Sequence, residues 1–198
     1  MKSYDRAYFD RWYRDPGDRV STTQSLRRKV QMAVCVAEYL LGRPIRTVVD
    51  VGCGEAPWFP ILRSLRKNAR YIGIESSEYA LERYGEARNI RRGSLGDLPK
   101  MRLPRPVDLV VCADVLQYVE TREIEQGLKG IHRVLGGVAY IEAFTTDDSM
   151  VGDSDHWHDR SAADYRKLFR HVGLVQCGPY CWTNPYRLSG LNELEVSG

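Results

Sequence analysis

A short acidic and glycine-rich run is the first part of this 198-residue sequence that has the composition of a binding site. It reads Asp50-Val51-Gly52-Cys53-Gly54 and follows a β-branched stretch. Glycine has no Cβ, so its backbone can approach a ligand closely and can adopt positive φ angles without strain. The run therefore predicts a buried strand that ends in a ligand-binding turn.

Similar short polar or small-residue sites follow three later apolar runs. They are Glu75, Ser94-Leu95 and Cys112-Ala113-Asp114. In an open parallel sheet, ligands bind at the carboxyl ends of the strands, so we expect these residues to lie around the glycine turn. A carboxylate at Glu75 could accept hydrogen bonds from both hydroxyls of a ribose, and an exposed carboxylate at a strand end is the simpler alternative.

Three side chains could move or orient a proton. His156 and His158 flank Trp157 in a polar segment, and Tyr118 follows the most apolar strand. A histidine titrates near neutral pH, which suits a general base, and Tyr118 would position an acceptor. The alternatives are an exposed, non-catalytic histidine loop and a packed tyrosine ring. The histidine pair lacks a third ligand, so we expect no metal site.

Aromatic residues near the N-terminus recur at helical spacing. Tyr4, Tyr8 and Trp12 are four residues apart, with Phe9 and Tyr13 beside them. On a helix these rings would form one face, which predicts either a lid over the ligand or a helix docked on the sheet.

These residues require an alternation of strands and helices to position them. Strands are expected at 47–51, 71–75, 89–91, 107–112 and 138–144, helices at 22–41, 58–70, 77–85, 120–135 and 161–171, and a strand or hairpin at 174–182. The connections are long enough for right-handed crossovers. We therefore expect an α/β fold in which helices cover both faces of a mainly parallel sheet.

From Thr47 to Leu135 the chain resembles the class I S-adenosylmethionine (SAM)-dependent methyltransferases. The resemblance rests on the acidic glycine run, on Glu75 and on the strand run Val107–Val119. It implies a Rossmann-like, seven-stranded sheet, SAM as cofactor, and S-adenosylhomocysteine (SAH) as product. The cofactor-binding residues that it implies, with one from the lid, are Asp50, Gly52, Cys53, Gly54, Glu75, Ser76, Ser94, Leu95, Cys112, Ala113 and Trp12.

The sequence departs from the family pattern at three places. Ala56, followed by Pro57, stands where a third glycine is common. Ser94 replaces an acid that binds the adenine amino group, and the nearby Asp97 is more typical of a turn cap. Gln117-Tyr118 replaces a Glu-His pair, which removes two titratable groups.

The resemblance implies methyl transfer to an oxygen or nitrogen of a small-molecule acceptor by in-line displacement, a reaction that mainly requires alignment. The alternatives are an RNA or protein methyltransferase, an NAD(P)-binding oxidoreductase and a non-catalytic SAM-binding module. Pro57 occupies the last glycine position of the dinucleotide fingerprint, which disfavours the oxidoreductase. Asn184-Pro185-Tyr186 only superficially resembles an adenine-methylation motif and is expected to form a turn.

Composition sets the remaining expectations. Apolar residues make up 43% of the chain and charged residues 28%, with a net charge of +3. We expect one domain over 1–198, with an N-terminal helical lid (1–45), a SAM-binding core (46–144) and an acceptor-side region (145–198). The sequence shows no secretory leader and no membrane-spanning run, so we expect a cytoplasmic protein without a membrane partner. Its five cysteines form no C-x-x-C pair, which disfavours disulfides and a structural zinc site. The small net charge argues against a nucleic-acid partner. Oligomeric state does not follow from the sequence.

Overall fold

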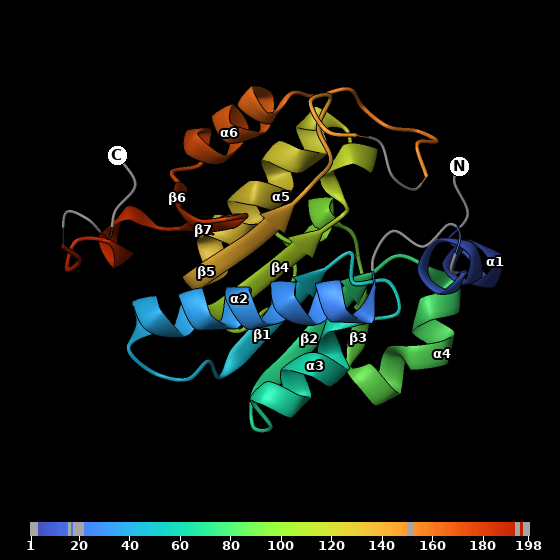
Figure 1. The fold of residues 1–198 in the computed structure, drawn as a ribbon, viewed down its shortest axis with the longest axis horizontal. Coiled ribbons are helices and arrows are strands. Elements are labelled where there is room, and N and C mark those ends of the chain that lie inside the picture. The colour runs from blue at the N-terminus through green and yellow to red at the C-terminus, as the bar shows by residue number, and fades with distance from the viewer. Residues whose placement is uncertain (1–3, 16, 18–21, 150–152, 193–194, 196–198) are drawn as a thin grey trace.

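A seven-stranded sheet forms the centre of the computed structural model, which describes residues 4–15, 17, 22–149, 153–192 and 195 (Figure 1). The strand order is β3-β2-β1-β4-β5-β7-β6. The first five strands pair in parallel, and β7 pairs antiparallel with both β5 and β6. This confirms the predicted fold class. The strands are β1 Thr47–Val51, β2 Arg70–Glu75, β3 Ile90–Arg92, β4 Val107–Ala113, β5 Leu135–Glu142, β6 Val175–Gly178 and β7 Cys181–Thr183.

Helices cover both faces of the sheet. Residues of α2 and α3 pack with one face in a first buried cluster, and residues of α5 and α6 pack with the other face in a second. The α-helices are α1 Arg6–Phe9, α2 Thr23–Leu41, α3 Trp58–Leu65, α4 Glu78–Arg88, α5 Thr121–Val134 and α6 Ala162–His171. The shorter turns are the π-helix η1 Asp10–Arg14 and the 3-10 helices η2 Leu95–Asp97, η3 Leu116–Tyr118 and η4 Pro185–Arg187.

Side-chain caps begin four of the helices, and left-handed residues end two of them. The carboxylate of Asp5 accepts from the backbone N–H of Tyr8 at the start of α1. The hydroxyls of Thr22, Ser77 and Ser161 accept from backbone N–H groups at the starts of α2, α4 and α6. Gly42 ends α2 and Asn89 ends α4, both with positive φ. These caps agree with the predicted helix positions, because such residues satisfy backbone groups that a helix leaves unpaired.

Three predicted elements have clearly different bounds in the structure. The helix expected at 77–85 continues to Arg88, and Asn89 then ends it in the left-handed region. The helix expected to reach residue 70 ends at Leu65, because Arg66 leaves the helical region to bind Glu38 of α2, and Arg70 pairs with Thr47 as the first residue of β2. The fifth strand begins at Leu135 and ends at Glu142, whereas 138–144 was expected. A Cβ on Gly137 would lie 2.1 Å from the backbone oxygen of Asp108, so glycine lets β5 approach β4 closely.

Among the described residues, no helix combines the length and apolar character needed to cross a membrane.

Candidate active site

The glycine turn after β1 has the backbone geometry that its residue types predict. Gly52 has φ 65° and Gly54 has φ 54°. A Cβ on Gly52 would lie 2.4 Å from Cγ2 of Val115, and a Cβ on Gly54 would lie 2.9 Å from Cε1 of Phe9. Neither position has room for a larger residue without a shift of its neighbour. Ala56, at the third glycine position, also adopts a positive φ of 56° and is fully buried.

Glu75 connects the end of β2 to this turn. Its Oε2 accepts from the backbone N–H of Gly54 at 2.7 Å, and its Oε1 accepts from those of Ser76 and Ser77 at 2.7 and 2.8 Å. The carboxylate is largely buried, yet it also lines a cavity beside the turn. The turn is therefore held in place by the same group that could accept from ligand hydroxyls.

Two cavities of about 280 Å³ each meet at the glycine turn. We call them the first and second cavities. Both are lined by Phe9, Tyr13, Gly52, Gly54 and Asp114. Of the predicted cofactor residues, the first cavity is also lined by Asp50, Cys53 and Ala113, and the second by Glu75, Ser76, Ser94 and Leu95. The structure thus brings most of the predicted set together at the carboxyl ends of β1, β2 and β4.

Two of the predicted cofactor residues lie elsewhere. The side chain of Cys112 is fully buried in the core on the α5 face and lines neither cavity. Trp12 lines a third cavity of about 20 Å³, beside Tyr8 and Tyr13. Any contact of Cys112 with a ligand would therefore involve its backbone, and Trp12 lines neither the first nor the second cavity.

The two histidines lie outside the first and second cavities. The side chain of His156 is 61% exposed and lies 3.6 Å from that of Asp155, while His158 lines a separate, more open hollow of about 530 Å³ against α6. Between them, the ring of Trp157 stacks on Phe144 with centroids 5.6 Å apart. The structure does not bring either histidine to the glycine turn, and their role as bases stays a prediction.

Tyr118 lies at the junction of the second and third cavities. Its hydroxyl donates to the backbone oxygen of Asp153 at 2.7 Å, and its ring packs edge-on against Trp157. Burial raises the pKa of the Tyr118 phenol, so it is protonated at neutral pH. The placement fits a positioning group better than a base.

Burial also perturbs the titratable groups beneath the turn. It raises the pKa of Asp50 to about 7, although the hydroxyl of Tyr71 donates to Asp50 Oδ2 at 2.7 Å. It raises the pKa of the Cys53 thiol well above its usual range, so Cys53 is a neutral lining group and not a nucleophile.

The N-terminal segment is fixed across the glycine turn. Phe9 is buried against Gly54, and the guanidinium of Arg14 donates to both carboxylate oxygens of Glu55 at 2.5 and 2.6 Å. The backbone oxygen of Tyr4 accepts from the hydroxyl of Ser77. Glu55 thus lines the first cavity and ties the segment to it.

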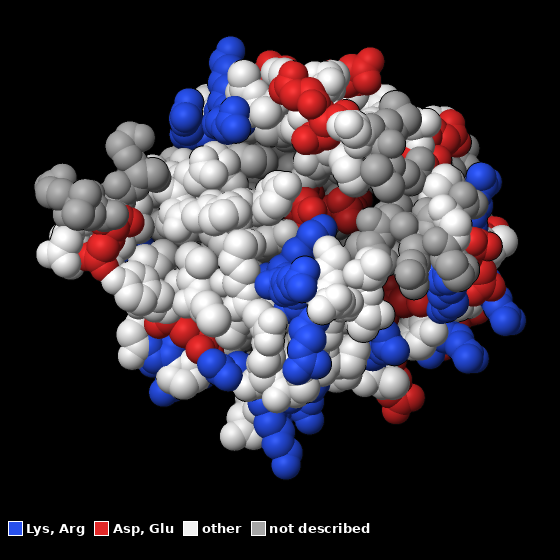
Figure 2. All heavy atoms as spheres, viewed as in Figure 1, with Lys and Arg blue, Asp and Glu red and all other residues white. Residues whose placement is uncertain are grey.

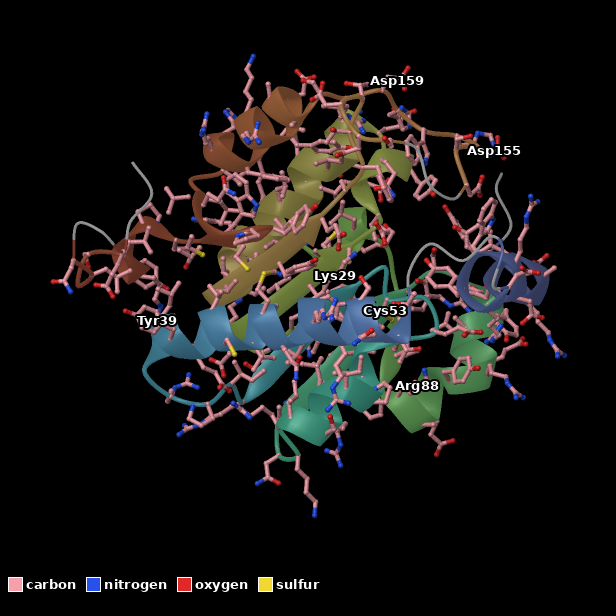
Figure 3. The ribbon with its side chains drawn as sticks, in the orientation of Figure 1. Lys29, Tyr39, Cys53, Arg88, Asp155 and Asp159 are labelled. Carbon is pink, nitrogen blue, oxygen red and sulfur yellow. The ribbon has the colours of Figure 1, made fainter. Side chains whose placement is uncertain are left out.

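Three further charged residues belong to this site. Sequence reasoning placed Asp114 at the end of the fourth strand without a role, and it missed Glu142 and Lys29. Asp114, with φ 60°, lines all three cavities, and its buried Oδ1 has no hydrogen-bond partner among the described residues. Burial and then the charge of Glu142 raise the pKa of Asp114 to about 6. Lys29 of α2 donates to Glu142 Oε1 at 2.5 Å (Figure 3). Glu142 could have been found, because it lies at a strand end, whereas nothing in the sequence marks Lys29.

Two predicted turns have the expected form. Asp97 accepts from the backbone N–H of Ser94 at 2.9 Å and caps the short η2 helix. Asn184-Pro185-Tyr186 opens the η4 turn, and the Asn184 amide donates to the backbone oxygen of Leu135. Leu135 begins β5, so this motif lies at the opposite end of the strand from the cavities.

Comparison with known proteins agrees with this geometry. Residues 48–137 match the family model described as "Methyltransferase domain". No curated protein sequence gives a significant match. Solved structures show the same fold. One is the plantazolicin methyltransferase BamL, in complex with a substrate analogue and SAH (14% identity, TM-score 0.61, 77% of this chain and 65% of that one).

Two further similar structures are Streptomyces venezuelae DesVI and the magnesium protoporphyrin IX methyltransferase ChlM from Synechocystis PCC 6803 with bound SAH. DesVI is 15% identical, with a TM-score of 0.63, over 81% of this chain and 92% of that one. ChlM is 22% identical, with a TM-score of 0.55, over 88% and 89%. The chain spans only 65%, 50% and 59% of the length of three of the matched structures. Residues 48–137 thus match a methyltransferase domain, and the sheet that contains them has the fold of class I SAM-dependent methyltransferases.

Proposed function

We propose that this chain transfers the methyl group of SAM to an oxygen or nitrogen of a small-molecule acceptor. The observation that carries the proposal is the pair of cavities that meet at the glycine turn, with the Glu75 carboxylate lining one of them. An elongated ligand with a ribose near its middle fits this arrangement. A Cβ at Gly52 would clash with Val115, and a Cβ at Gly54 would clash with Phe9, so a larger residue at either position would push these side chains toward the ligand.

Each end of the cofactor has candidate partners in the chain. Leu95 and Ser94 would meet the adenine, and Glu75 would accept from the ribose hydroxyls. The methionine portion would lie in the first cavity, where Lys29 and Arg14 are the cationic lining residues among those described and could bind its carboxylate. When bound, SAM supplies a methyl carbon made electrophilic by a positively charged sulfur.

The residues of the chain would mainly align the reactants and exclude water. Phe9 and Tyr13 cover the place where the two large cavities meet, and Tyr118 would orient the acceptor there. His156 and His158 stay candidate bases for an acceptor that must lose a proton, and they would have to turn inward to reach it. We propose the same division as above, with a lid to residue 45, a cofactor core to 144 and an acceptor side beyond.

The names of the similar structures support a small-molecule acceptor. BamL acts on plantazolicin and ChlM on magnesium protoporphyrin IX, according to their descriptions. The modest net charge of +3 gives no reason to expect a nucleic-acid partner.

Calorimetric titration tests the cofactor assignment directly. We expect SAM and SAH to bind with one site per chain and NADH not to bind. Saturable binding of NADH without binding of SAM would overturn the proposal. Incubation with methyl-labelled SAM and a metabolite extract then tests transfer itself, because a SAM-binding chain that labels nothing is a binding module and not an enzyme.

A further inference from the structure

The third cavity marks where an acceptor would meet the methyl group. Residues shared by the first and second cavities surround the point between the two ends of the cofactor, and two of them, Tyr13 and Asp114, also line the third cavity. Four more aromatic rings line this third cavity: those of Tyr8, Trp12, Tyr118 and Phe144. Rings with a carboxylate among them form the kind of site that attracts cations.

Asp114 is the lining acid with an unsatisfied oxygen. Five other acidic residues line the two large cavities, and each accepts from an identified donor: Asp50 from Tyr71, Glu55 from Arg14, Glu75 from Gly54, Glu123 from Gly96 and Glu142 from Lys29. Oδ1 of Asp114 is buried and has no partner among the described residues. A buried carboxylate without a partner is costly, so a bound donor or cation would stabilise it.

Negative charge is in excess around these cavities, even with Asp50 only partly ionised because its pKa is raised to about 7. Six acidic and two basic side chains line the two large cavities in the described part of the chain. Figure 2 shows acidic atoms at the floor of a hollow in the face that carries α2. SAM carries one net positive charge and would offset only part of this excess. The site therefore favours a second positively charged ligand over a neutral or anionic one.

We propose that the acceptor is an amine whose nitrogen lies beside Asp114 within the aromatic rings of the third cavity. This inference rests on the proposed methyl transfer and names its substrate class. The described residues leave space of about 20 Å³ there, so the amine enters as a small end group.

The charge balance of N-methylation explains why the site can work without a histidine. The amine arrives as an ammonium ion and first loses one proton to solvent. Its lone pair then forms the N–C bond while the C–S bond breaks and leaves its electron pair on sulfur. Positive charge thus moves from sulfur to nitrogen, toward the Asp114 carboxylate, which stabilises the transition state without accepting a proton. All four histidines are among the described residues, and none lines the three cavities.

The test follows labelled methyl groups from SAM into a metabolite extract and locates each label by tandem mass spectrometry. We expect the label on nitrogen. A label on oxygen or carbon would overturn the amine assignment and leave methyl transfer intact. If SAM binds but nothing is labelled, the proposed function itself fails, and this inference fails with it.

Asp114→Asn tests the residue without changing its shape, and asparagine tolerates the positive φ at this position. We expect kcat/KM for the labelled amine to fall about 100-fold, with the Kd values of SAM and SAH within threefold of the wild type. The control is Asp159→Asn, the same change at an exposed position, which should alter none of these values. If Asp114→Asn weakens SAM tenfold or more but not the uncharged thioether SAH, then Asp114 binds the sulfonium and the proposal is wrong.

Discussion

Gly52→Ala should weaken cofactor binding far more than an ordinary glycine substitution does. At φ 65° an alanine costs about 1–2 kcal/mol relative to glycine. The added Cβ would also lie 2.4 Å from Val115 Cγ2, and overpacking of this kind costs about 1–3 kcal/mol more. Val115 lines the second cavity, so relief of the clash moves it toward the cofactor. A loss of about 2 kcal/mol in binding raises the Kd of SAH about 30-fold.

Gly42→Ala is the matched control. Gly42 ends α2 with φ 62°, and a Cβ there would meet nothing within 4 Å. This variant carries the same backbone cost without a clash and away from the cavities. We expect it to lower the free energy of unfolding by about 1–2 kcal/mol, which is a fall in Tm of about 2–8 °C for a chain of this size. Its Kd for SAH should equal that of the wild type.

Calorimetry with SAH and thermal unfolding with and without SAH separate the two contributions. Adding Val115→Ala to Gly52→Ala removes the clashing methyl groups, so the double variant should regain part of the affinity but not the backbone contribution to stability. The reasoning is refuted if Gly52→Ala binds SAH as the wild type does, or if Gly42→Ala weakens binding to the same extent.

Four further predictions concern the charged residues. Glu75→Gln should raise the Kd of SAH and of 5′-methylthioadenosine by a similar factor of about 10–100, because both ligands carry the ribose; unequal losses would place Glu75 elsewhere. Lys29→Met should weaken SAH about tenfold but leave 5′-methylthioadenosine, which has no carboxylate, unchanged in calorimetry. Burial alone would raise the pKa of Asp108, but Arg43 and the backbone N–H groups at the start of β1 lower this pKa overall. Asp108→Asn should therefore lower the free energy of unfolding in urea by about 2–3 kcal/mol at pH 7. The difference from the wild type should vanish as the pH falls below about 4, where the carboxylate is protonated. Since the folded pKa of Asp114 is raised to about 6, its ionisation disfavours the folded state, and unliganded Asp114→Asn should be more stable than the wild type above pH 6, by an amount that shrinks toward pH 4.

The strand ends were predictable because two independent signals coincide there. β-branched runs identify buried parallel strands, and the residues that follow them must lie at one edge of the sheet. This logic placed Asp50, Glu75 and Ser94 correctly beside the cavities. It could not place Lys29, whose partner Glu142 is 113 residues away, because only the packed structure brings α2 against the end of β5.

The N-terminal aromatic residues show how local backbone geometry defeats a spacing rule. Four-residue spacing placed Tyr4, Tyr8 and Trp12 on one α-helical face. The α-helix gives way to the π-helix η1 after Phe9, and the wider turn changes which residues align. Phe9 and Tyr13 therefore line the two large cavities, and Trp12 lines only the small third one.

The histidine loop shows how packing decides which side chain of a polar segment points inward. His156 and His158 have suitable chemistry, but Trp157 between them competes for the inward position. Burial of an indole ring is worth more than burial of an imidazole, and Phe144 and Tyr118 offer it aromatic partners. With Trp157 packed inward and His156 at a positive φ of 64°, the imidazole of His156 points to solvent. The role of the two histidines as bases stays a prediction, and an amine acceptor would need no base in the transfer step.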